Sequence, residues 1–116
     1  MTFDELRDYC LSKHATTESL PFDEQTLVFK VSGKLFALSD IEARPVRVNL
    51  KCDPERAIEL REQHTAVQPA FHMNKRHWNS VTSDGSIRDS FLRELIDHSY
   101  ERVVAGLPKA IRESLT

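Results

Sequence analysis

Residues 69–81 read PAFHMNKRHWNSV and contain the only tryptophan of the chain, Trp78. The same stretch holds two histidines and the adjacent cations Lys75 and Arg76. From position 63 to position 83 there is no Asp or Glu, so the segment combines local positive charge with an aromatic ring and several hydrogen-bond donors. This combination suits contact with phosphate groups or nucleobases.

Trp78 also has a purely structural interpretation. A lone indole in a small domain is usually a core residue, because it buries a large apolar area while its N–H keeps a hydrogen-bond partner. We therefore expect Trp78 to pack in the core, with the polar side chains of Asn74, Lys75, Arg76 and His77 acting from the surface.

Composition indicates one compact globular domain over residues 1–116. The chain is 40% hydrophobic and 29% charged, which provides for a single core. No apolar run approaches the roughly 20 residues that cross a bilayer. Residues 1–12 alternate charged and apolar side chains, unlike a signal peptide, so we expect a cytoplasmic protein. Cys10 and Cys52 form no C-x-x-C motif and are expected to be buried free thiols.

The overall charge argues against strong nucleic-acid binding, but its distribution argues for a basic face. The formal net charge is −2 and the pI is near 6.2, whereas dedicated nucleic-acid binders are usually basic. Residues 26–51, however, carry five cations against two acids. A basic face on an acidic body is the arrangement that reconciles the two observations.

The first helix is predicted from its cap. Thr2 followed by Glu5 forms a capping box, in which each side chain accepts a hydrogen bond from the backbone N–H of the other. Phe3, Leu6 and Cys10 then follow helical spacing and form one apolar stripe.

Residues 26–39 predict a β-hairpin around a Ser32-Gly33 turn. Such a turn places Phe29 opposite Phe36 and Leu27 opposite Leu38, which would give one strongly apolar face. Lys30 then points to the other face, and Lys34 stands near the tip of the hairpin.

Residues 46–51, VRVNLK, predict a strand with two different faces. The apolar residues Val46, Val48 and Leu50 would face the core. Its polar face displays two cations and an amide in a row: Arg47, Asn49 and Lys51. This face is either a binding surface or the ordinary wet side of an antiparallel sheet.

The remaining elements follow from local signals. Asp53-Pro54 predicts the start of a second helix, with Asp53 as N-cap. Residues 78–82 favour a strand. We expect Ser86 to cap the last long helix, Gly106 to end it, and Pro108 to begin a short final helix.

Three blocks of sequence carry a family resemblance: PAFHMNKRHWNSV at 69–81, FKVSGKLFAL at 29–38 and DHSYERVV at 97–104. With the H-x-N-K-x-H-W core and the Ser99-Tyr100 pair, the chain resembles the MmcQ/YjbR family of small bacterial proteins along its whole length. The resemblance implies a CyaY-like α+β fold, with helices packed on an antiparallel β-sheet. It also implies the double-wing label, under which these proteins are described as DNA-binding. It supplies no catalytic residues.

Catalysis and metal binding find no support in the residues. His72 and His77 could supply a base, but no Ser or Cys nucleophile and no paired acids accompany them. Zinc needs more ligands than this H-x4-H pair, and a frataxin-like iron site needs an acidic ridge, which Arg7 interrupts in the first helix. We expect no enzyme activity, no cofactor and no metal.

Two functions of different class remain. In the first, a monomeric domain binds DNA or RNA without catalysis, with modest and steeply salt-dependent affinity. Its contacts would be Lys30, Lys34, Arg47, Lys51, Lys75 and Arg76 on phosphates, with hydrogen bonds or stacking from Asn74, His77 and Trp78. In the second, the same segment belongs to a module that binds a protein or a small ligand, and its polar residues hold a shaped loop. Cations gathered on one continuous face favour the first function, and scattered cations favour the second.

Overall fold

The computed structural model describes residues 1–70 and 72–115. Phe71 and Thr116 lie outside the described residues. The described chain alternates helices with a run of strands, in the order α1 (Phe3–Leu11), β1 (Thr16–Ser19), β2 (Thr26–Val31), β3 (Lys34–Asp40), β4 (Arg47–Lys51), α2 (Pro54–Gln63), β5 (Val67–Pro69), β6 (Trp78–Thr82), α3 (Asp89–Ala105) and α4 (Lys109–Ser114).

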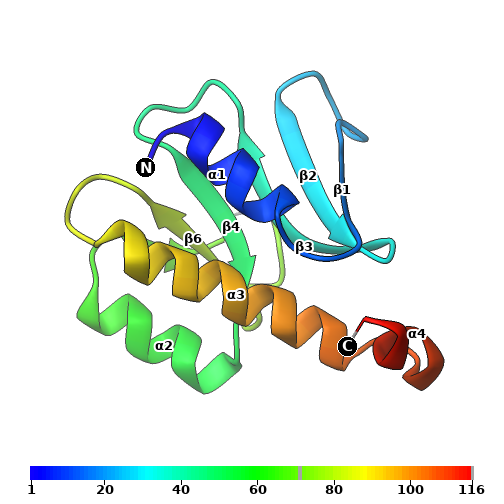
Figure 1. The fold of residues 1–116 in the computed structure, drawn as a ribbon. Coiled ribbons are helices and arrows are strands. Elements are labelled where there is room, and N and C mark those ends of the chain that lie inside the picture. The colour runs from blue at the N-terminus through cyan, green and yellow to red at the C-terminus, as the bar shows by residue number, and fades with distance from the viewer. Residues whose placement is uncertain (71, 116) are drawn as a thin grey trace.

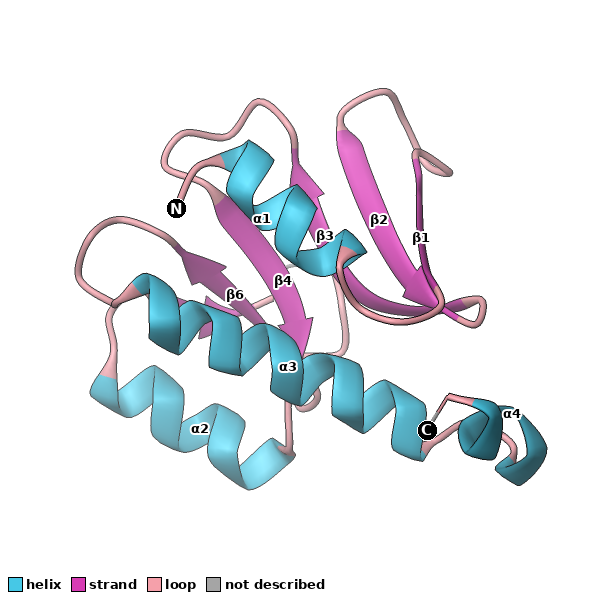
Figure 2. Cartoon of the chain, in the orientation of Figure 1, coloured by secondary structure: helices cyan, strands magenta, loops and turns pink. Residues whose placement is uncertain are grey.

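The strands form one antiparallel sheet in the order β1-β2-β3-β4-β6-β5. Helices α1, α2 and α3 lie on the same side of this sheet, and α3 crosses its centre against β3 and β4 (Figure 1). Figure 2 shows α4 beyond the end of α3, away from the strands. The predicted α+β architecture is therefore confirmed, and it leaves the second face of the sheet without a helix in the described part of the chain.

The core lies between the sheet and the helices. From β4 it receives the alternate residues Val48 and Leu50, as the polar and apolar alternation of that strand predicted. Both cysteines are buried free thiols, as expected. Burial raises the pKa of the Cys10 thiol to about 12, because the thiolate loses its hydration there.

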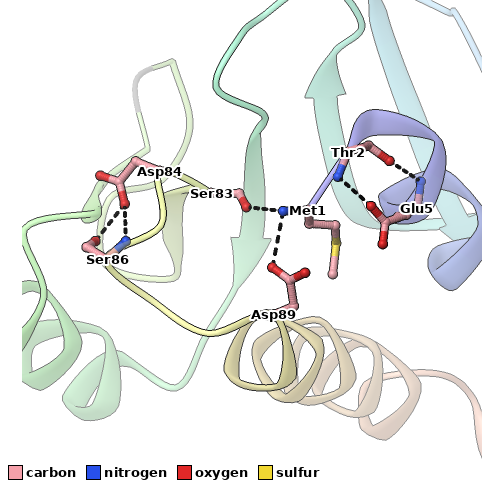
Figure 3. A network of polar contacts seen from close by, with 7 residues as sticks. All are labelled: Met1, Thr2, Glu5, Ser83, Asp84, Ser86 and Asp89. Atoms are coloured by element: carbon pink, nitrogen blue, oxygen red, sulfur yellow. Dashed lines mark hydrogen bonds and ion pairs between the residues drawn. The ribbon is translucent and has the colours of Figure 1, made fainter.

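The start of α1 is tied to the start of α3 by polar contacts (Figure 3). The predicted capping box is present, with Thr2 and Glu5 exchanging two hydrogen bonds of 3.1 Å. The ammonium group of Met1 donates to Ser83 Oγ at 2.8 Å and to Asp89 Oδ1 at 3.1 Å (Figure 3). These bonds hold the first helix against the segment that leads from β6 into α3.

The predicted cap of α3 was wrong. The helix begins at Asp89, with Arg88 in the N-cap position and no side-chain cap. Asp84 Oδ1 accepts hydrogen bonds from both the N–H and the hydroxyl of Ser86, at 2.9 and 2.6 Å (Figure 3). Ser86 therefore belongs to a local turn three residues before the helix. An aspartate can bind the backbone and side chain two positions later, and this turn replaces the predicted capping of the helix by Ser86.

The Ser32-Gly33 turn is confirmed, but the predicted pairing across the hairpin was wrong. Both turn residues have positive φ, +47° and +83°, as a two-residue hairpin turn of type I′ requires. A β-bulge then shifts the register, so Phe29 lies opposite Ala37 and Leu27 lies opposite Ser39. Phe36 is the extra residue of the bulge.

The bulge changes which side chains line each face of β3. Phe36 and Ala37, although consecutive, both belong to the core, because the extra residue breaks the alternation. Leu38, predicted to face the core with Leu27, instead lies on the opposite face beside its partner Val28. That face, which carries no helix in the described part of the chain, therefore has an apolar component which the sequence pattern did not predict.

Ser99 of α3 fills the gap that the bulge opens between β3 and β4. Its hydroxyl donates to the carbonyl oxygen of Phe36 at 2.5 Å and accepts from the N–H of Lys51 at 2.8 Å. Ladder pairing between these strands begins one step further on, at Ala37 and Leu50. One buried side chain thus connects two backbone groups at the end of the ladder.

Strands β1 and β5 were not predicted. Residues 16–19, TTES, lack an apolar alternation, and β5 is only three residues long. Both pair at the edges of the sheet, where the backbone partner matters more than side-chain pattern. Among the described residues, no helix has the length and apolar character needed to span a membrane.

Candidate functional site

The face of the sheet opposite the helices carries most of the predicted site residues, and we call it the open face. Its membership follows from the alternation of side chains along each strand, counted from the core residues. The open face is formed by Thr26, Val28 and Lys30 of β2, Leu35, Leu38 and Asp40 of β3, Arg47, Asn49 and Lys51 of β4, Gln68 of β5, and Trp78, Ser80 and Thr82 of β6.

Strand direction divides the open face into two ends. Because neighbouring strands are antiparallel, β2 and β4 end where β3 and β6 begin. Five of the six predicted cations lie at this end, which we call the basic end: Lys30, Lys34, Lys51, Lys75 and Arg76. They come from residues 30 to 76, so it is the sheet that brings them together.

Arg47 is the cation that does not join this group. It begins β4, whereas Lys51 ends the same strand, so the two lie about 13 Å apart at the rise of an extended chain. Arg47 lies instead at the opposite end of the open face, which we call the distal end. It pairs with Thr82 of β6, and Asp40 follows the β3 residue that pairs with Val48, the neighbour of Arg47.

The predicted cations are largely uncommitted. Lys30, Lys34, Lys51, Arg47 and Arg76 take part in none of the ion pairs found among residues 1–70 and 72–115. Lys34, Arg47 and Arg76 are exposed, and Lys30 and Lys51 are half-buried. Their charges are therefore available to an incoming anion.

The turn that precedes β6 is held by its own backbone and by Asn74. The carbonyl of Asn74 accepts from the N–H groups of His77 and Trp78, at 3.1 and 2.9 Å. Its side-chain Oδ1 accepts from the N–H of Arg76 at 3.0 Å. The carbonyl of His77 accepts from the N–H of Cys52 at 2.8 Å, which ties the turn to the end of β4. Asn74 and His77 are thus engaged in shaping the turn that carries Lys75 and Arg76.

Arg61 of α2 supports this turn from the helix side of the sheet, a role that was not predicted. Its guanidinium donates to Asn79 Oδ1 at 2.7 Å, to the carbonyl of Lys75 and to the carbonyl of Trp78 at 3.4 Å. Asn79 is itself buried and donates to the carbonyl of Ala57. The available signal was a polar Asn at the core-facing position of a strand, which needs a partner.

Trp78 lies on the open face rather than in the core, so the core interpretation was wrong. It is half-buried and is absent from the core cluster. Asn79 and Val81 take the positions that face the helices, and alternation sends Trp78 the other way. It pairs directly with Lys51, so the two residues are cross-strand neighbours at the basic end.

A hollow of about 910 Å³ extends from the distal end across the middle of the open face and reaches Lys75 at the basic end. Leu35 and Leu38 contribute its apolar lining on β3, and Arg47 and Asn49 line it on β4. Phe22, 72% exposed, belongs to the loop before β2 and lines the hollow together with Met73 from the turn before β6. The hollow therefore combines apolar and polar surface within one site.

Metal ligands are not grouped in this way. Within the part of the chain that the structure describes, no three His, Cys, Asp or Glu side chains come close enough together to hold a metal ion.

Comparison with known proteins identifies relatives over nearly the whole chain. The family model described as YjbR matches residues 11–102. The Escherichia coli (strain K12) protein YjbR is 42% identical over 116 residues, covering 99% of this chain and 98% of its own. An Escherichia coli protein, YbdF, is 42% identical over 90 residues, covering 77% of this chain and 73% of its own.

Solved structures agree with the fold. The crystal structure of Deinococcus radiodurans protein DR2400, a DUF419 domain, is 44% identical with a TM-score of 0.92, covering 98% of this chain and 87% of that chain. A Pseudomonas syringae protein is 28% identical with a TM-score of 0.76, covering 88% of this chain and 98% of that chain. By sequence and by structure, this chain belongs to the YjbR family.

Proposed function

We propose that the domain is a non-catalytic nucleic-acid-binding module that uses the basic end of the open face. The observation that carries this proposal is the gathering of five cations from separate segments beside a half-buried tryptophan. Phosphates would be neutralised by Lys30, Lys34, Lys51, Lys75 and Arg76, and a base would stack on Trp78.

An uncovered sheet favours an unpaired strand over a duplex. Single-stranded nucleic acids bind to sheet surfaces by stacking bases on aromatic rings while cations follow the backbone. Trp78 lies next to Lys51 on such a surface. Five phosphate contacts on a single strand predict that the logarithm of affinity falls with the logarithm of salt with a slope of about −3.5.

Fluorescence tests this proposal directly, because Trp78 is the only tryptophan. Titration with a single-stranded oligonucleotide should quench its emission, and affinity should fall about 100-fold between 50 and 200 mM salt. A Lys51→Gln/Arg76→Gln double variant should weaken binding at least about tenfold, since two phosphate contacts are lost.

The matched control removes the same number of positive charges, one Lys and one Arg, from α4. Lys109 and Arg112 lie on that helix, away from the sheet. A Lys109→Gln/Arg112→Gln variant has the same net charge as the test variant and should bind like the parent protein. Equal weakening by the two variants, or no binding at low salt, would refute the proposal.

A further inference from the structure

The hollow at the distal end has a polar half and an apolar half that a single small molecule could span. Cross-strand pairing places Leu38, Asn49 and Ser80 in one row across β3, β4 and β6. Arg47 and Thr82 form the next row on the same face. Directly opposed side chains are about 5 Å apart and diagonal ones about 7 to 8 Å apart, so Arg47 and Leu38 lie within reach of one ligand.

The acidic residues of the hollow are engaged in its own loops. Asp23 Oδ1 accepts from the N–H groups of Gln25 and Thr26, at 2.8 and 2.7 Å, and its Oδ2 accepts from the Thr26 hydroxyl at 3.2 Å. Asp40 Oδ1 accepts from the N–H of Glu42 at 2.9 Å. The hydrogen bonds from Gln25 and Thr26 lower the pKa of the Asp23 carboxyl group by stabilising its charged form.

The donors of the hollow are not engaged to the same degree. The guanidinium of Arg47 makes no hydrogen bond or ion pair with the residues that the structure describes. Among residues 1–70 and 72–115, the amide nitrogen of Asn49 donates only to the sulfur of Met73, at 3.7 Å, which is a weak acceptor. The hollow therefore offers a cation and an amide donor beside an apolar surface.

We propose that this hollow binds a small organic anion, a carboxylate carried on an apolar or aromatic body. Arg47 pairs with the carboxylate in the two-pronged geometry that guanidinium groups favour, and Asn49 adds a donor. The body of the ligand packs on Leu35 and Leu38 beside the exposed ring of Phe22. A volume of about 910 Å³ is in the range of small-molecule sites. The proposal can be tested apart from nucleic-acid binding through Arg47, which lies at the other end of the face, whereas Lys75 of the basic end also lines the hollow.

Two probes that share a ring system and differ in charge test the proposal. Naphthylacetate carries a carboxylate, and naphthylethylamine carries an ammonium on the same naphthalene body. In an NMR titration of the labelled protein, naphthylacetate should shift the amide signals of Leu38, Asn49, Ser80 and Thr82 saturably. Naphthylethylamine should bind at least about tenfold more weakly, because it cannot pair with a guanidinium.

Variants distinguish this site from the basic end. Arg47→Gln should weaken naphthylacetate binding about tenfold or more, while the matched control Arg112→Gln leaves it unchanged. The Lys51→Gln/Arg76→Gln variant should keep naphthylacetate binding even if it loses the oligonucleotide. The proposal is overturned by any of three results: no saturable shifts at millimolar naphthylacetate, equal binding of the amine, or unchanged affinity in Arg47→Gln.

Discussion

Replacing Ser99 by alanine tests how the bulge in β3 is held. Ser99 is fully buried, with 0% of its surface exposed, and its hydroxyl bonds to one carbonyl and one N–H of the backbone. Ser99→Ala removes both bonds. Each buried backbone group left without a partner costs about 1 to 3 kcal/mol. For the two groups together, we therefore expect the free energy of unfolding to fall by about 2 to 6 kcal/mol.

Such a loss is large against the total stability of a small domain, about 5 to 15 kcal/mol. Urea unfolding followed by circular dichroism measures it. The control is Ser90→Ala, an exposed position on the same helix, which should change stability by less than about 0.5 kcal/mol. Hydrogen exchange provides a local readout, because the amide of Lys51 should exchange faster in Ser99→Ala. A stability loss no larger than that of Ser90→Ala would refute the reasoning.

Two further predictions concern the helix side of the sheet. Arg61→Lys should lower the free energy of unfolding by about 1 to 3 kcal/mol, because an ammonium cannot reach the three acceptors of the guanidinium. An unchanged urea midpoint would contradict it, with Arg112→Lys as control. Burial, aided by Arg56 and Arg102, lowers the pKa of His98 in the folded state. The unfolded chain therefore takes up this proton first, and stability should fall as the pH drops below about 6.5. His98→Gln should reduce this fall between about pH 7 and pH 5, whereas the exposed His14→Gln should not.

Most residues of the candidate site can be predicted from the sequence, but their positions relative to one another cannot. The VRVNLK strand correctly predicted that Arg47, Asn49 and Lys51 share a face. It did not indicate that Arg47 and Lys51 belong to different ends, because the neighbours at each end come from other strands. Arg61 illustrates the same limit, since its acceptors lie 14 to 18 residues further along the chain.

The sequence alone determined the local features: the capping box at Thr2, the Asp53 cap of α2, the Ser32-Gly33 turn and the membership in a family. The two caps and the turn each depend on residues a few positions apart, so a short segment carries the whole signal, whereas the family is identified from several blocks along the chain. Tertiary structure decided the bulge at Phe36, whose ring packs edge-on against Tyr100 and whose carbonyl binds Ser99, 63 residues away. It also decided that Trp78 faces outward and that the cations of three segments meet at one end of the sheet. These outcomes follow from packing and strand pairing between distant segments, and at Phe36 that packing overrides the local alternation.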